Sequence, residues 1–175
     1  LTNVATVVRN AANLDIMGLE LEMQFQATEK LRLRAAYGYL DAEYTGYIAD
    51  LVGDGIVTDN DYLTPRNTPK NTLSIGATHT TQMGEGELQS SFSYRYRSEM
   101  EGDPSNDVRG YQDSITNLNV DITYGWGEGQ KYRVAVYGKN LTDEREAIWR
   151  TIHPLLSFRQ WNEGATYGVQ FDYNF

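Results

Sequence analysis

Hydrophobic and polar residues alternate with a period of two along most of the chain. Near the C-terminus, Val169, Phe171 and Tyr173 fall on one side and Gln170 and Asp172 on the other. This alternation is typical of β-strands that have one apolar and one polar face. The same pattern predicts seven strands, over residues 19–26, 31–39, 72–78, 88–97, 117–126, 132–139 and 166–175, and a weaker eighth over residues 3–8.

The connections between these strands are alternately short and long. The short ones contain Gly and Glu, as hairpin turns do, and cover residues 27–30, 83–86 and 127–130. The long ones cover residues 47–71, 100–112 and 143–164. All four prolines lie in the long connections, where they do not interrupt a strand ladder. The pattern therefore predicts an antiparallel sheet with every short turn at one end.

The composition excludes several classes of protein. A net charge of −9 argues against binding to nucleic acid, which needs a basic face. The absence of Cys excludes thiolate metal sites and a Cys nucleophile. No apolar run is long enough for a transmembrane helix. The mean hydropathy of −0.56 suggests a soluble protein. A membrane β-barrel can have an equally low mean hydropathy, because its strands alternate apolar and polar residues.

The apolar faces favour a membrane barrel over a soluble lipocalin-like barrel. They carry many Tyr residues, often near strand ends, and a closed core would have difficulty pairing so many hydroxyl groups. Aromatic girdles at a membrane interface need this combination of an apolar ring and a polar tip. Short turns at one end and long loops at the other are also the outer-membrane pattern. The aromatic residues in question are Tyr37, Tyr39, Tyr94, Tyr96, Tyr124, Trp126, Tyr132, Tyr167 and Tyr173.

The polar faces carry charges of both signs. Opposite charges on neighbouring strands could form ion pairs across the ladder, and each pair would contribute less than about 1 kcal/mol. We favour a solvated, charge-balanced lumen wall over a wall that grips something filling the lumen. The residues of this predicted wall are Glu20, Glu22, Arg32, Arg34, Arg95, Arg97, Asp121, Arg133, Lys139 and Asp172.

Two of the long loops contain candidate binding residues. The last loop combines aromatic and cationic side chains, which suit an anionic, ring-bearing ligand but could equally pack the loop; these are Trp149, Arg150, His153, Phe158, Arg159 and Trp161. The first long loop is rich in oxygen ligands that could bind Ca²⁺, although a solvated acidic loop is the favoured interpretation; these are Asp50, Asp54, Asp59, Asn60 and Asp61. His79 is expected at the membrane interface. We expect no catalytic residue, no resident metal and no cofactor.

Several short motifs resemble the TonB-dependent outer-membrane receptors. Residues 138–144 contain Asn140, Leu141, Thr142 and Asp143, similar to the NLTD signature of that family. The final strand ends on Phe175, as in many outer-membrane barrels. Residues 65–70, Pro-Arg-Asn-Thr-Pro-Lys, and residues 18–22, Gly-Leu-Glu-Leu-Glu, also match the family's habits. The resemblance covers essentially the whole chain.

The resemblance implies a bacterial outer-membrane location and an all-β, antiparallel transmembrane barrel of about 22 strands with a plugged lumen. Residues 1–175 would be its last seven or eight strands, and the plug domain and TonB box would lie outside this chain. The implied function is TonB-energised uptake of a scarce nutrient, most often a ferric siderophore. The implied partners are membrane lipid and lipopolysaccharide, the rest of the barrel and plug, TonB through the N-terminal part, and a metal-chelate ligand. Phe175 would also serve as the barrel-assembly signal.

The sequence is also compatible with other functions. A small passive outer-membrane barrel, porin-like or an adhesin, would need no further strands. An outer-membrane enzyme would need a nucleophile with a nearby base, and Ser157 beside His153 lacks supporting context. The chain begins with Leu1 and shows no signal peptide, so we expect it to be processed or part of a longer protein.

Overall fold

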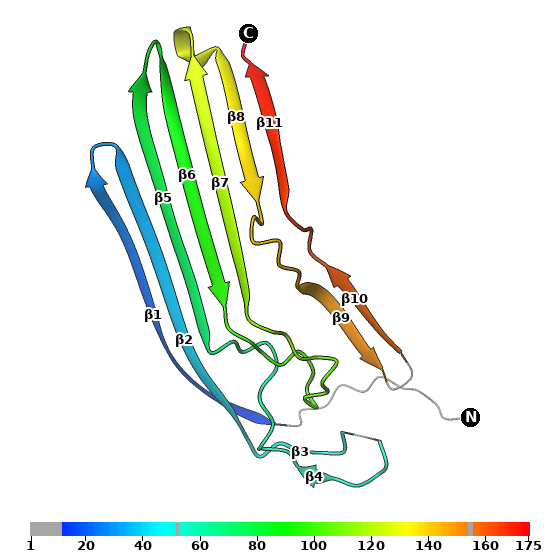
Figure 1. The fold of residues 1–175 in the computed structure, drawn as a ribbon. Coiled ribbons are helices and arrows are strands. Elements are labelled where there is room, and N and C mark those ends of the chain that lie inside the picture. The colour runs from blue at the N-terminus through cyan, green and yellow to red at the C-terminus, as the bar shows by residue number, and fades with distance from the viewer. Residues whose placement is uncertain (1–11, 52, 154–155) are drawn as a thin grey trace.

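A computed structural model of the chain describes residues 12–51, 53–153 and 156–175. Its main feature is an antiparallel seven-stranded sheet in the order β1-β2-β5-β6-β7-β8-β11 (Figure 1). Every strong prediction from the alternation is confirmed, whereas the weak strand over residues 3–8 lies outside the described residues. The strands are β1 (Asn13–Thr28), β2 (Leu31–Thr45), β5 (Asn71–Met83), β6 (Gly86–Arg97), β7 (Ile115–Trp126), β8 (Tyr132–Lys139) and β11 (Thr166–Tyr173).

The predicted asymmetry of the connections is confirmed, with the short turns together at one end of the sheet (Figure 1). Two of the long connections contain short hairpins that the alternation does not predict. β3 (Ile48–Ala49) pairs with β4 (Thr58–Asp59), and β9 (Ala147–His153) pairs with β10 (Leu156–Trp161). The one helical element in the described ranges is a single 3₁₀ turn, Glu128–Gln130.

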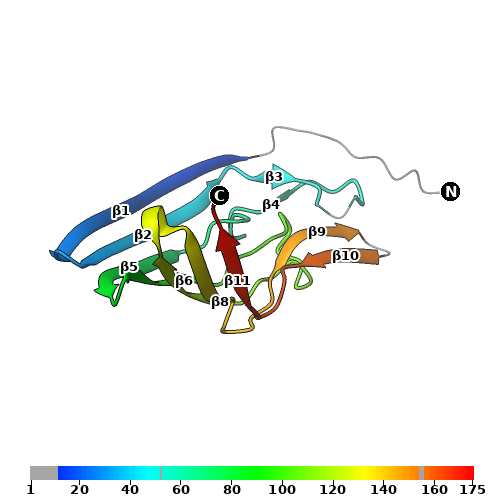
Figure 2. The same ribbon diagram turned by 90° about the horizontal axis from the view of Figure 1, so that it is seen from above.

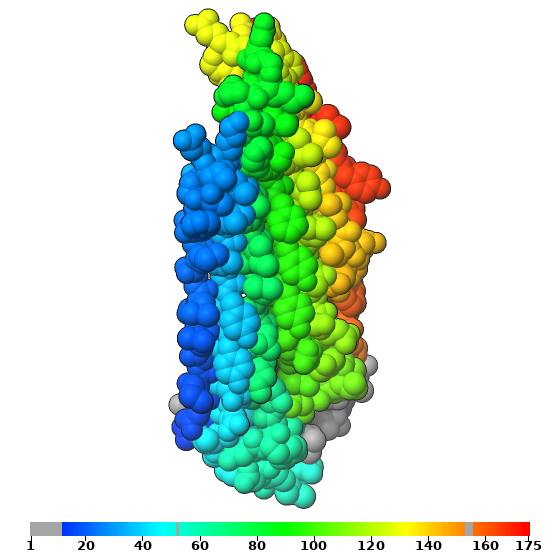
Figure 3. Space-filling view, turned by 60° about the vertical axis from the view of Figure 1, so that its left-hand side comes forward, coloured from blue at the N-terminus to red at the C-terminus, as the bar shows by residue number. Residues whose placement is uncertain are grey.

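The strand register places the predicted apolar residues on one continuous face. One row across the sheet runs from Met23 through Ala35, Ile75 and Tyr94 to Leu118. Because side chains alternate along each strand, the polar residues form matching rows on the other face. Figure 3 looks onto the sheet from the side of β1 and shows the strands as one unbroken wall.

The sheet forms a single curved layer, as the view from above shows (Figure 2). Among the described hydrophobic residues, only Tyr47 and Ala135 are buried. Large apolar side chains along the outer face are half exposed, including Phe25, Val136 and Phe171. A soluble barrel would bury this face, so the absence of a second layer over it among the described residues favours contact with lipid. No described helix has the length and apolar character needed to cross a membrane.

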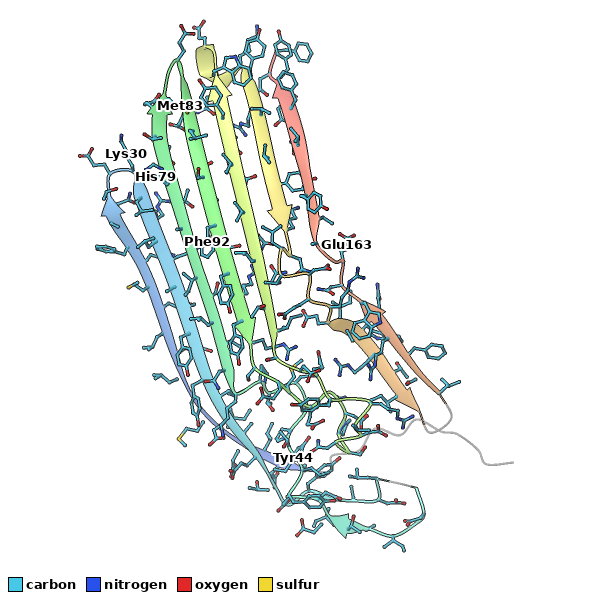
Figure 4. All side chains as sticks on the ribbon, viewed as in Figure 1. Lys30, Tyr44, His79, Met83, Phe92 and Glu163 are labelled. Atoms are coloured by element: carbon cyan, nitrogen blue, oxygen red, sulfur yellow. The ribbon has the colours of Figure 1, made fainter. Side chains whose placement is uncertain are left out.

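Aromatic rings gather at the short-turn end of β7, β8 and β11. Tyr124, Trp126, Tyr132, Tyr173 and Phe175 form a chain of neighbouring rings, with centroids 5.0–5.5 Å apart. Such rings combine an apolar body with a polar edge and suit the headgroup level of a membrane. The exposed His79 on β5 lies near Lys30, at the turn between β1 and β2 (Figure 4), consistent with the interfacial position expected for it.

The two outer strands of the sheet, β1 and β11, each pair on one side only. Tyr167 and Val169 on β11 are 79% and 71% exposed, the pattern expected where another strand is missing. Unpaired strand edges do not occur in the hydrocarbon region of a membrane. The seven strands are therefore an arc of a barrel that other strands must complete.

Candidate ligand-binding hollow

A hollow of about 1020 Å³ lies on the polar face at the long-loop end of the sheet. Its floor consists of residues of β1, β2, β5, β6 and β7, among them the polar-face residues Glu22 and Arg95, and its sides come from the long connections. The charged residues that line it are Glu20, Glu22, Arg66, Arg95, Arg97, Glu146 and Arg150. The hollow thus joins part of the predicted lumen wall to part of the predicted binding loop, although these two sets are far apart in sequence.

The ion pairs that the wall charges could form across the ladder are not present between the described strands. Arg32 and Arg34 lie opposite Gln26 and Gln24, because the hairpin register sets them away from Glu22. Arg133 is in register with Asp172, but it donates a 3.3 Å hydrogen bond to Gln130 instead. No ion pair joins two members of the predicted wall within the part of the chain that the structure describes.

One wall residue, Arg97, is instead paired with the loop that precedes β9. Its guanidinium lies 3.3 Å from Glu146 and donates a 2.8 Å hydrogen bond to the carbonyl oxygen of Ser98. The Arg97 side chain is only 16% exposed, so its charge is largely removed from water and the pairing matters more than at a free surface. Sequence reasoning missed Glu146, because nothing in its local pattern points toward β6.

The NLTD motif forms an anchor that holds the hairpin β9–β10 to the sheet. Asn140 is 5% exposed, and its side-chain amide donates 3.0 Å hydrogen bonds to the carbonyl oxygens of both Glu144 and Glu163. These carbonyls lie on opposite sides of the hairpin base, so one amide group ties the two chain segments together; Figure 4 labels Glu163 at this junction. The carboxylate of Glu144 accepts two hydrogen bonds from Thr116, at 2.6 and 2.7 Å. We call Asn140, Thr142 and Glu144 the hairpin anchor.

The backbone of the anchor also has a special conformation. Asn140 has φ of +49° and Asp143 has φ of +54°, in the left-handed region that Asn and Asp tolerate better than most residues. The hydroxyl of Thr142 donates to the carbonyl oxygen of Thr116 and to the side-chain oxygen of Asn140. The motif therefore combines a chain reversal after β8 with satisfied buried polar groups.

Two arginines of the hairpin β9–β10 contact the connection between β6 and β7. Arg150 and Arg159 lie directly opposite each other in the hairpin. Arg150 donates to the carbonyl oxygen of Gly110, and Arg159 donates to that of Arg109. Burial lowers the pKa of Arg150, and the nearby charges of Arg159 and Arg97 lower it further. The hairpin is therefore hydrogen-bonded to the connection between β6 and β7 by Arg150 and Arg159, two residues that the sequence suggested as ligand contacts.

The candidate ligand-binding residues of the last loop are only partly gathered in the hollow. Trp149 lines it and is 54% exposed. Phe158 and Trp161 are also about half exposed but do not line the hollow, and Arg159 lies 5.8 Å from the ring centroid of Trp161. The side chain of His153 lies outside the described part of the structure. Among the described side chains of this set, only Trp149 and Arg150 line the hollow together with the wall residues.

A second, smaller hollow of about 500 Å³ lies further along the polar face. Arg34, Asp121 and Lys139 of the predicted wall line it. Lys139 lies 5.4 Å from the ring centroid of Tyr137. The two hollows together place most of the predicted wall charges on the concave side of the sheet, as the alternation predicts.

The long connections are joined to one another as well as to the sheet. The side chain of Asn106 donates to the carbonyl oxygen of Thr64 and accepts from its amide, both over 2.8 Å. The amide of Asn67 donates to the carbonyl oxygen of Glu101 over 2.7 Å. With the contacts of Arg150, these hydrogen bonds link all three long connections around the hollow.

Carboxylates of the Asp-rich loop stabilise its backbone turns. Asp50 accepts hydrogen bonds from the amides of Gly53 and Gly55, and Asp61 accepts from those of Gly46 and Tyr47. Such turn contacts use the oxygens that a Ca²⁺ site would need. Among the described residues, no three His, Asp or Glu side chains form a group that could hold a metal ion.

Asp61 should make the first long loop sensitive to acid. The backbone amides of Tyr47 and Gly46 lower its pKa below the ordinary value of 3.8. Asp61 therefore stabilises the loop above that value, and the contribution is lost as the pH falls through the lowered pKa. Hydrogen exchange of residues 46–61 should accelerate in this acidic range. Asp61→Asn should exchange rapidly already at pH 7, whereas Asp113→Asn should not; equal exchange in both variants would contradict this role.

The curved antiparallel sheet, with one apolar and one polar face and two open edges, defines a segment of an outer-membrane β-barrel. The sequence model of the family described as TonB dependent receptor-like, beta-barrel matches residues 1–141. The chain belongs to this family, whose members are receptor barrels of the outer membrane rather than enzymes. The match includes the first two residues of the NLTD motif, Asn140 and Leu141.

Solved receptor structures share this fold. The chain is similar to the ferric yersiniabactin uptake receptor FyuA from Yersinia pestis, with 19% identity and a TM-score of 0.69 over 91% of this chain. It is also similar to the siderophore receptor PiuA from Acinetobacter baumannii, with 21% identity and a TM-score of 0.70 over 91% of this chain. A third is BauA, the ferric preacinetobactin receptor of Acinetobacter baumannii, with 22% identity and a TM-score of 0.64 over 95%.

The chain covers 22–23% of the length of these three solved receptors, so it corresponds to a segment of their structures. No curated protein sequence matches the chain. The incomplete sheet agrees with the coverage, because both describe a part of a larger barrel.

Proposed function

We propose that this chain forms part of the wall of an outer-membrane receptor for TonB-energised uptake of a ferric siderophore. The observation that carries the proposal is the hollow, in which Arg66, Arg95, Arg97 and Arg150 converge with the exposed ring of Trp149. Guanidinium groups recognise anionic oxygens, and indole rings stack on planar groups. By their names, the solved receptors to which the chain is similar are a siderophore receptor and receptors for ferric yersiniabactin and ferric preacinetobactin.

The open edges of β1 and β11 support the remaining parts of the proposal. The other strands of the barrel would pair with these edges, and a plug domain would face the polar wall. The chain 1–175 would then be the C-terminal part of the barrel, and TonB would contact an N-terminal part of the same receptor. Lipid and lipopolysaccharide would cover the apolar face.

The test is uptake of labelled iron by iron-starved cells that carry or lack the complete gene. We expect at least one ferric siderophore to be taken up only when both the gene and TonB are present. Unchanged uptake of every ferric siderophore after deletion would overturn the proposal. Gene-dependent uptake that persists without TonB would instead identify a passive, porin-like barrel.

The hollow is tested by a matched pair of variants in the same cells. Trp149→Ala should reduce uptake, because it removes the exposed ring that lines the hollow. Tyr62→Ala is the control, since Tyr62 is 81% exposed and lies outside the hollow. Equal uptake by the two variants at equal surface levels would argue against ligand binding at this place.

A further inference from the structure

The four arginines of the hollow differ in what they already bind. Arg97 is paired with Glu146, and Arg150 donates to the carbonyl oxygens of Gly110 and Ala147. Arg66 and Arg95 are exposed and have no hydrogen bond or ion pair with any residue that the structure describes. Two of the four guanidinium groups are therefore used in holding the loops, and two are free for a ligand.

The acidic residues of the hollow do not neutralise Arg95. Glu20 and Glu22 lie on β1, whereas Arg95 lies on β6. Three strand-to-strand steps separate them, which is about 14 Å at the usual spacing of antiparallel strands. That separation is between the backbones, and no ion pair joins Arg95 to Glu20 or Glu22 among the described residues.

The floor between these two charged edges consists of small side chains. The row that contains Glu22 and Arg95 passes through Ala36 and Ser74, and the adjacent row passes through Gly38 and Thr72. A ligand can therefore approach the wall and reach the guanidinium group of Arg95.

Resting on the proposed function, we infer that Arg66 and Arg95 select a ferric chelate that carries negative charge on carboxylate or catecholate oxygens. Arginine presents a planar set of donors that can bind two such oxygens at once. A neutral or cationic chelate would leave both guanidinium groups without a partner. Arg150 and Arg159 would act on the ligand only indirectly, by holding the hairpin β9–β10 against the neighbouring loop.

The test measures binding to the complete receptor purified in detergent. The probes are a negatively charged ferric tris-catecholate, ferric citrate and an uncharged ferric tris-hydroxamate. We expect the wild-type receptor to prefer an anionic probe, and Arg95→Gln to weaken that binding about tenfold or more, equivalent to about 1.4 kcal/mol or more. Arg66→Gln should also weaken binding of the anionic probe, and Arg95→Lys should retain part of the wild-type affinity.

Arg145→Gln is the matched control, because Arg145 is an exposed arginine of the last long connection that does not line the hollow. It should bind the anionic probe like the wild type. Loss of affinity in Arg95→Gln should also reduce the dependence of binding on salt, since a charged contact has been removed. Circular dichroism of each variant identifies those that fail to fold.

The outcomes separate this inference from the proposed function. If ferric chelates bind but the wild type prefers the uncharged probe, or if Arg95→Gln and Arg66→Gln bind the anionic probe normally, the inference fails and the proposed function stands. If no ferric chelate binds but an iron-free anionic nutrient does, with loss in Arg95→Gln, the proposed function fails and the anion site stands.

Discussion

Replacing Phe92 with arginine should block insertion of the barrel, whereas the same change at the preceding residue should be tolerated. Phe92 lies about halfway along β6 on the apolar face (Figure 4), opposite Ala77 and Val120. An arginine near the middle of the lipid face costs about 2–4 kcal/mol. Ser91 lies on the polar face in register with Asp121, so an arginine there gains an acidic neighbour.

The measurement is the amount of heat-modifiable receptor in outer membranes of cells expressing the complete gene. Phe92→Arg should reduce it severely, and Ser91→Arg should leave it close to the wild-type amount. Phe92→Leu keeps the apolar character and should also assemble. Equal assembly of Phe92→Arg and Ser91→Arg would contradict the assignment of the two faces.

Replacing Asn140 with alanine should have the second large effect. The substitution removes both donors at the base of the hairpin β9–β10 and leaves the carbonyl oxygens of Glu144 and Glu163 without them. It also places a residue with less tolerance of positive φ at +49°. Together these losses should destabilise the folded receptor by roughly 2–4 kcal/mol.

Asn140→Gly separates the two causes. Glycine accepts the left-handed backbone but has no side-chain amide, so Asn140→Gly should unfold at a temperature between those of the wild type and Asn140→Ala. Asn13→Ala is the matched control, because the Asn13 side chain is exposed and makes no hydrogen bond with a described residue. The unfolding temperature follows from the heat-induced gel shift. A wild-type value for Asn140→Ala would show that the anchor contributes little.

The seven strands and their two faces could be predicted from sequence because the side-chain period of a strand is fixed. Residues such as Met23 and Tyr94 reveal their face without knowledge of any partner. Register is a different matter, since it depends on where each turn begins. The alternation correctly placed Arg34 on the polar face, but it could not show that Gln24 lies opposite.

The site was less predictable because its contacts join distant loops. The sequence 147–153, Ala-Ile-Trp-Arg-Thr-Ile-His, lacks a clear alternation, so it does not predict the hairpin that carries Trp149 and Arg150. The family motif of residues 65–70 contains Arg66, but the sequence does not indicate that Arg66 lines the hollow. The anchor role of Asn140 follows from hydrogen bonds to residues 144 and 163. A short motif match identifies the residue without revealing those partners.

The hydrogen bonds among the long connections affect how such receptors could be re-engineered. Asn106 of the second long connection is hydrogen-bonded to Thr64 of the first. Arg150 of the third is hydrogen-bonded to Gly110 of the second. A loop transplanted alone from another receptor would lose its complementary neighbours and leave their polar groups unmatched. Specificity could therefore be exchanged most cleanly by moving the three connections as one cassette, so that the contacts between them are inherited together.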